Sequence, residues 1–196
     1  MGRSVKAALA CVALLAAACG DGAKKEEVAS AAPTPAPQPG PVPVAGPEEL
    51  VSQVAGSWER SAGAADHGYA RWGYVLDAGG TYTFKSERWF GPLRANEWHL
   101  TREEGSWTVS AGELSLAPVS ARGTVVDGNG AELKTFDVPL ERTTYAWKKQ
   151  LFEGLGETQL VLTPPAATQR DGDFGGNDAF PASYLFSANR TIEWKF

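Results

Sequence analysis

Few side chains in this sequence are placed to bind a metal ion. His67 and His99 are its two histidines, whereas a zinc site needs three or four converging ligands. Asp171 and Asp173 have the spacing of the first and third ligands of a calcium-binding loop, but Ala182 stands where such a loop closes with a glutamate. We therefore interpret this stretch as an acidic, glycine-rich loop, and we expect neither a metal ion nor another cofactor.

The sequence also lacks the usual arrangements of a hydrolase. It contains no Gly-x-Ser-x-Gly turn, and neither histidine accompanies a nucleophile motif. Glu103 and Glu104 are adjacent, so in a strand their side chains point to opposite faces and cannot act as an acid and base pair across a sugar. We expect a protein that is not an enzyme, with an enzyme of unrecognised type as an alternative.

One reactive side chain has a context that indicates modification. Cys19 follows a short positive segment with Arg3 and Lys6 and an apolar run over residues 7–18, the length of a signal-peptide core rather than of a membrane-spanning helix. The small residues directly before Cys19 resemble the lipobox of bacterial lipoproteins. That resemblance implies removal of residues 1–18 and lipidation of Cys19, which would anchor the protein to a membrane. An ordinary signal peptide cut at the same alanine-rich site is the alternative.

The residue after this cysteine bears on where the protein resides. In the lipoproteins that this segment resembles, an acidic residue there often retains the product in the inner membrane, and Gly20 occupies that position here. We therefore expect a bacterial cell-envelope protein, in the outer rather than the inner membrane, with its domain facing the periplasm or the cell surface. Cys11 lies inside the leader, which leaves Cys19 no partner for a disulfide.

A tether is expected to follow the cysteine. Residues 19–47 consist mainly of Ala, Pro, Gly, Lys and Glu and contain no aromatic residue, so they cannot bury enough apolar surface to offset the entropy of ordering. Proline stands at every second position over residues 33–43, which favours extended polyproline II structure. We expect a disordered, semi-rigid spacer between the anchor and a folded domain at residues 48–196.

The pattern changes to that of strands in this second part. Tyr82 and Phe84 alternate with polar neighbours, and Leu114 and Leu116 do the same, so each strand has one apolar face. Turn segments lie between such runs at residues 77–80, 110–113 and 127–130. Further strands are expected at residues 57–60, 70–77, 97–102, 132–140, 143–152, 159–163, 183–187 and 191–196. The fold class is therefore all-β, an antiparallel up-and-down β-barrel of about eight to ten strands, with a short helix in PEELVSQV before it.

A family resemblance supports this fold. The phrase VAGSWE, with Gly56 and Trp58, looks like the entry motif of lipocalins and of lipocalin-like bacterial lipoproteins. Residues 79–84 (GGTYTF) and 105–118 (GSWTVSAGELSLAP) are similar to repeated phrases of that group. The resemblance implies a barrel that binds a small ligand. It also implies a basic residue over Trp58 at the closed end of the barrel, and Arg190 and Lys195 are the candidates.

Aromatic side chains are the remaining resource for binding. We expect ligand contacts from five of them, which are Trp58, Tyr82, Phe84, Trp89 and Trp107. Trp89 and Phe90 are expected at the rim, because Trp89 breaks the phase set by the strand before it.

The predicted function is that of a lipid-anchored, non-catalytic envelope protein that binds a small apolar or amphiphilic molecule in or at the mouth of the barrel. The alternative is a carbohydrate-binding module. A net charge of −5 without a basic stripe argues against nucleic acid as a partner.

Overall fold

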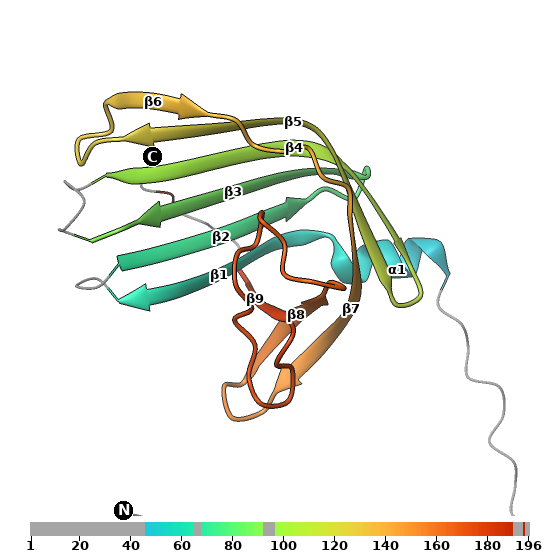
Figure 1. The fold of residues 1–196 in the computed structure, drawn as a ribbon. Helices are drawn as coiled ribbons and strands as arrows, with labels where there is room; N and C mark the ends of the chain where they lie inside the picture. Colours follow the sequence, from blue (N-terminus) through green and yellow to red (C-terminus); the bar gives the residue numbers. More distant parts are fainter. Residues whose placement is uncertain (1–45, 65–67, 92–96, 190–193, 195–196) are drawn as a thin grey trace, which may run out of the picture. The chain divides into compact units, whose positions relative to one another are not determined.

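A computed structural model describes residues 46–64, 68–91, 97–189 and 194 (Figure 1). Within these residues one short helix, α1 (Pro47–Val54), precedes nine strands. The strands are β1 (Gly56–Ala64), β2 (Gly68–Leu76), β3 (Thr81–Trp89), β4 (Trp98–Ser110), β5 (Glu113–Val126), β6 (Glu132–Phe136), β7 (Thr143–Phe152), β8 (Glu157–Thr163) and β9 (Tyr184–Ala188). The predicted leader, Cys19, the tether up to residue 45, His67 and the strand at 191–196 lie outside the described residues, apart from Trp194. Pro47, expected as the last residue of the tether, instead begins α1.

Eight antiparallel strands close into a barrel, which confirms the predicted fold class. The strands follow one another around the ring as β1, β2, β3, β4, β5, β7, β8 and β9, and β9 pairs with β1 again through Trp58 and Glu59. The ninth strand, β6, pairs with the second half of β5, while β7 pairs with the first half. Figure 1 shows the long strands β1 to β5 side by side and the hairpin of β7 and β8 extending away from them.

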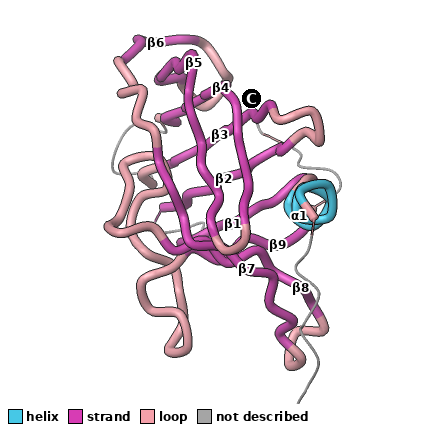
Figure 2. The backbone as a smooth tube through the Cα atoms, turned by 90° about the vertical axis from the view of Figure 1, so that its right-hand side faces the viewer, coloured by secondary structure: helices cyan, strands magenta, loops and turns pink. Residues whose placement is uncertain are grey.

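The predicted turns are also found, and glycine makes them sharp. Gly80 ends the turn between β2 and β3 with φ of 87°, and Gly112 ends the turn between β4 and β5 with φ of 89°. Residues with a side chain avoid this left-handed region, whereas glycine enters it at little cost. The two hairpins therefore form where the sequence supplies glycine, and both place their turns at the α1 end of the barrel, which faces the viewer in Figure 2.

The apolar core fills the barrel beside α1. Trp58 on β1 is 3% exposed, and its indole Nε1 donates a 2.7 Å hydrogen bond to the carbonyl oxygen of Val54, the last residue of the helix. The Nζ of Lys149 on β7 lies 5.5 Å from the Trp58 ring. Arg190 and Lys195, the basic residues expected there, are outside the described part of the chain. The helix and the first strand thus close one end of the barrel, so any opening lies at the other end.

Candidate functional site

A loop without strand structure enters the barrel and brings a carboxylate with it. Residues 164–183 connect β8 to β9, and Asp171 in this loop has 0% exposure. Its carboxylate accepts hydrogen bonds from the hydroxyls of Tyr74 and Tyr145, both at 2.6 Å, and from Thr168 Oγ1 at 2.7 Å. A buried carboxylate is stable only when donors replace its water, and three hydroxyl groups do so here. Asp171 therefore ties the loop to β2 and β7.

An arginine from the first strand holds the same loop from the other side. Arg60 donates from Nη2 to the carbonyl oxygen of Asp171 and from Nη1 to that of Asp173, the latter at 3.3 Å. The guanidinium carbon lies 3.9 Å from the ring centroid of Trp72, a cation–π contact. Burial lowers the pKa of Arg60, while the negative charge of Asp171 opposes that shift. This charged side chain thus fixes the loop against the barrel wall.

A second buried pair lies on the opposite wall. Arg170 Nε is 2.7 Å from Glu103 Oε1, and the hydroxyl of Tyr82 donates to the same oxygen at 2.6 Å. Glu103 is 2% exposed whereas its neighbour Glu104 is exposed to solvent, so the predicted opposite orientation of the two glutamates is confirmed. Arg170 also donates to Thr143 Oγ1 at 3.0 Å. The loop is consequently attached to β3, β4 and β7 as well.

A pocket of about 170 Å³ lies next to this polar network, toward the end of the barrel away from α1. Its walls come from inward-facing side chains of β2, β3 and β4, from the segment around Phe136 and from the inserted loop. The lining includes Ala70, Trp72, Phe84, His99, Thr101 and Phe136. The rings of Trp72, Phe84 and Phe136 share these walls with hydroxyl groups and with charged side chains, which are Glu87, Arg88, Glu103, Asp137, Glu141 and Arg170. A concave pocket that combines rings with polar groups is a candidate site for a small organic molecule.

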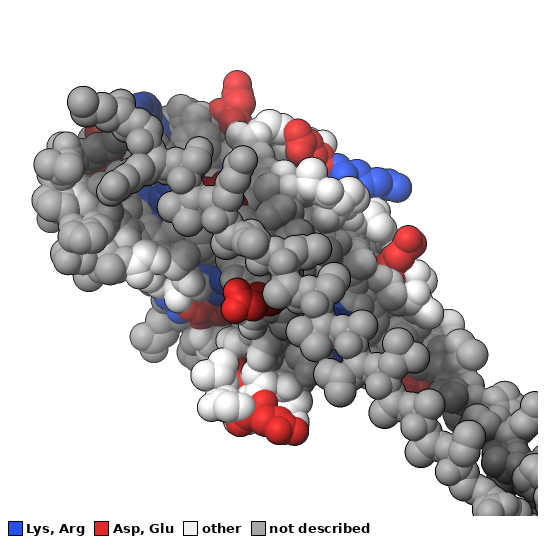
Figure 3. Space-filling model, turned by 60° about the horizontal axis from the view of Figure 1, so that its bottom comes forward, with Lys and Arg blue, Asp and Glu red and all other residues white. Residues whose placement is uncertain are grey.

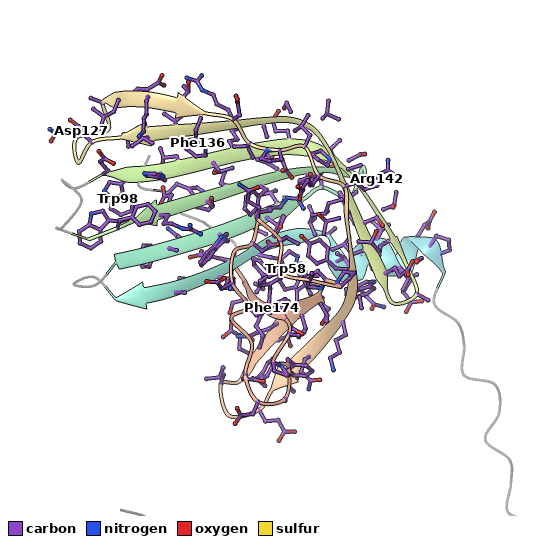
Figure 4. All side chains as sticks on the ribbon, viewed as in Figure 1. Trp58, Trp98, Asp127, Phe136, Arg142 and Phe174 are labelled. Carbon is purple, nitrogen blue, oxygen red and sulfur yellow. The ribbon has the colours of Figure 1, made fainter. Side chains whose placement is uncertain are left out.

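The outer wall of the pocket depends on a glycine. A Cβ atom at Gly123 on β5 would lie 2.2 Å from the ring of Phe136, so the ring covers that backbone directly. The ring of His99 lies 5.9 Å from that of Phe136 and 4.7 Å from that of Phe90. Figure 4 shows Phe136 beside β5 and Trp98 at the end of the barrel farthest from α1. Aromatic rings thus border the mouth.

The structure separates the five aromatic residues expected at the ligand. Trp58, Tyr82, Phe84 and Trp107 all belong to the packed core, and of these four Phe84 also lines the pocket. Trp89, at the end of β3, is half-buried, and its ring stacks on that of Trp98 with centroids 6.1 Å apart and an angle of 21° between the planes. Phe90 is half-buried as well and borders the mouth through His99. Of these five predicted residues, the structure brings Phe84 to the pocket.

Several residues of the site were not predicted from the sequence. Trp72 carries a usable signal, because it stands in phase with Tyr74 on an alternating strand. Arg170 and Asp171 carry none, because they belong to a loop whose neighbours show no periodicity. The carboxylate of Asp171, considered above as a calcium ligand, accepts from hydroxyl groups instead. Within the described residues, His, Cys, Asp and Glu side chains do not gather in any group of three suited to a metal ion.

Two further pockets lie elsewhere on the described residues, one lined by Lys85, Arg102 and Trp194 and one lined by Glu59, Leu155 and Asn189 among others. On the face shown in Figure 3, lysine and arginine side chains of the described residues do not merge into a basic patch, and acidic side chains are scattered among them. Within the described residues no helix has the length and apolar character needed to cross a bilayer. Comparison with known proteins adds no identity, since neither a family model nor a curated protein matches this chain.

Proposed function

We propose that this protein is a lipid-anchored component of the bacterial cell envelope that binds a small apolar or amphiphilic molecule at the mouth of its β-barrel. The observation that supports binding is the pocket of about 170 Å³ between Trp72, Phe84 and Phe136. The support for the anchor is the sequence around Cys19. The pocket is already formed in the structure, so a ligand need not order it on binding.

The size of the pocket limits the ligand. An engineered apolar cavity of about 150 Å³ in another protein holds one benzene molecule, so a pocket of about 170 Å³ accommodates a single ring with a short substituent. The inserted loop blocks any deeper extension, because Thr168 and Arg170 form part of the pocket lining and Asp171 lies beneath them in the network. A long acyl chain therefore does not fit along the barrel axis.

Filling the pocket is expected to weaken binding. In an Ala70→Phe variant a phenyl ring occupies the space, and the affinity for a small uncharged ring compound such as benzyl alcohol falls by about tenfold to a hundredfold, since a buried ring contributes about 1.5–3 kcal/mol. Isothermal titration calorimetry measures the loss. Val75→Phe is the matched control, because Val75 lies on the same strand with an exposed side chain. Equal affinity of the Ala70→Phe variant and the wild type would contradict binding in this pocket.

The carbohydrate-binding alternative depends on exposed ring faces. Trp89 and Trp98 are the candidates, but each stacks against the other, which occupies one face of each ring. Sugar-binding platforms need faces open to the solvent. The pocket therefore supports a small-molecule ligand better than the tryptophan pair supports a glycan. Titration of soluble oligosaccharides by the same calorimetry compares the two functions directly. If an oligosaccharide binds the wild type and binds the Ala70→Phe variant equally well, the carbohydrate-binding alternative is favoured.

The anchor has its own test. A Cys19→Ala variant cannot be acylated at that position, so after cell fractionation we expect it in the soluble fraction, whereas the wild type stays with the membranes. Cys11→Ala is the matched control, because it alters the other cysteine of the leader and should leave the protein in the membrane fraction. Immunoblots of both fractions report the result. Membrane retention of the Cys19→Ala variant would rule out the lipid anchor.

A further inference from the structure

Charged side chains directed into the barrel do not balance one another. Arg170 pairs with Glu103 at 2.7 Å, and Arg60 bonds to the main chain of Asp171, whose carboxylate supplies the nearest negative charge. Arg88 also borders the pocket. Within the part of the chain that the structure describes, Arg88 has no hydrogen bond and no ion pair. Its positive charge is therefore available at the pocket.

The position of Arg88 is set by its strand. It lies in register opposite His99, in the inward phase that includes Phe84. An added Cβ atom on Gly172 would lie 3.4 Å from Arg88 Nη2 and 3.4 Å from the ring of Trp72, so the guanidinium and the indole meet beside the inserted loop. The guanidinium carbon lies 5.9 Å from the Phe90 ring. Arg88 is exposed to solvent and thus stands at the rim of the pocket, next to its aromatic side chains.

Four acidic residues border the pocket, and none of them offsets this charge through an ion pair with Arg88. Glu103 is neutralised by Arg170. Glu87 is 4% exposed and follows the outward phase of β3, in register opposite Arg71 rather than beside Arg88. The remaining two, Asp137 and Glu141, lie on the segment between β6 and β7, and they are exposed to solvent as Arg88 is. Water therefore weakens their attraction to Arg88.

The second arginine near this site, Arg60, is already compensated. Burial lowers the pKa of Arg60, the negative charge of Asp171 opposes that shift, and the positive charge of Arg88 makes a smaller contribution. The positive charge that a ligand meets at the pocket is therefore that of Arg88. A negatively charged group is attracted to Arg88, whereas a cationic ligand is repelled.

We propose that the ligand of this pocket is a small cyclic or aromatic carboxylate whose carboxylate group binds the guanidinium of Arg88 while its ring lies against Trp72 and Phe136. This inference rests on the proposed function and specifies the class of ligand. Guanidinium and carboxylate groups match through two parallel hydrogen bonds, and such charge-assisted bonds are stronger than neutral ones. The ring occupies the interior and the charge remains at the mouth, as expected for an amphiphile of this size.

Three probes of nearly equal size test the charge. Benzoate, benzamide and benzylammonium are titrated into the full-length protein in detergent micelles, and calorimetry gives each affinity. We expect benzoate to bind about tenfold more tightly than benzamide, since a hydrogen bond to a charged group contributes about 1.5–3 kcal/mol. Arg88→Gln should reduce the benzoate affinity about tenfold and leave benzamide unchanged. Arg102→Gln is the matched control, because Arg102 on the adjacent strand is exposed and bonds to Glu104.

The outcomes separate this inference from the proposed function. Tighter binding of benzylammonium, or a preference for benzoate that survives in the Arg88→Gln variant, overturns the carboxylate class. The proposed function would survive that result if benzamide binds the wild type and the Ala70→Phe variant loses this binding, because the pocket would still bind a ligand. Absence of heat with all three probes overturns the carboxylate class, and absence of heat with benzyl alcohol as well removes the proposed function too.

Discussion

Replacing Asp171 with alanine is expected to lower the free energy of unfolding by about 3–5 kcal/mol, a large part of the stability of a domain of this size. The physical reason is that the change removes one acceptor and leaves several donors. The hydroxyls of Tyr74, Tyr145 and Thr168 all lose a bond of 2.6 or 2.7 Å in the interior. Arg60 at the same time loses its nearest negative charge. Urea denaturation followed by tryptophan fluorescence measures the change.

A neighbour in the same loop provides the control for this prediction. Asp173 is exposed, and it contacts Arg60 through its carbonyl oxygen rather than through its carboxylate. Asp173→Ala should therefore alter stability by no more than about 0.5 kcal/mol. Asp171→Asn, which retains one acceptor oxygen, should fall between the two. If Asp171→Ala and Asp173→Ala unfold at the same urea concentration, the buried carboxylate does not hold the loop as described.

The network also links stability to the pocket. Arg170 lines the pocket and is bound to Glu103, and Thr168 lines it while donating to Asp171. Release of the loop would remove this part of the wall and open the barrel interior to water. The pocket is therefore preorganised by buried polar bonds as well as by the apolar core, to which its lining residues Trp72 and Phe84 belong. Such bonds are costly when incomplete, so the loop adopts one position rather than several.

The strands could be predicted from sequence because the information is local. Tyr82 and Phe84 alternate with polar residues and lie on a strand, and the turn at residues 77–80 supplies its own glycine. The barrel follows from such hairpins, since sequential antiparallel pairing is the simplest way to bury one face of each strand. The strand expected at 132–140 is shorter than predicted. The strand β6 ends at Phe136, whose pairing with Gly123 is the last of its ladder with β5.

The site could not be predicted in the same way, because its residues come together only through the closed barrel. Asp171 meets Tyr74, which is 97 residues away in the chain, and no local pattern marks either one as a partner. Alternation shows that Tyr82, Phe84 and Trp107 face the interior, but it does not show how far along the barrel each one lies. That depth decides whether a ring of the core is enclosed by other side chains, as Trp107 is, or also lines the pocket, as Phe84 does.

Stability is expected to fall steeply in alkaline solution, by about 4 kcal/mol per pH unit above about pH 10. Burial raises the pKa of Tyr74, Tyr82 and Tyr145. The charge of Asp171 adds to the shift of Tyr74 and Tyr145, and the hydrogen bond to Glu103 adds to that of Tyr82. In the unfolded chain these hydroxyls ionise near pH 10, below their folded values. Their contribution is therefore complete below about pH 10 and is lost as the pH rises above it, at about 1.4 kcal/mol per pH unit for each group.

Urea unfolding at several values between about pH 9 and about pH 11 measures this slope, and the ultraviolet absorbance of phenolate shows whether the tyrosines ionise together with unfolding. A Tyr82→Phe variant removes one of these groups, so its slope should be smaller by about 1.4 kcal/mol per pH unit. The variant leaves Glu103 paired with Arg170, which keeps the carboxylate neutralised. A flat profile in the wild type, or phenolate absorbance that appears before the chain unfolds, would show that these hydroxyls are open to solvent. Equal slopes in the variant and the wild type would contradict a buried, neutral Tyr82. A hydroxyl that ionises only after unfolding must contribute to the loss of stability with pH, and its removal must lower the slope.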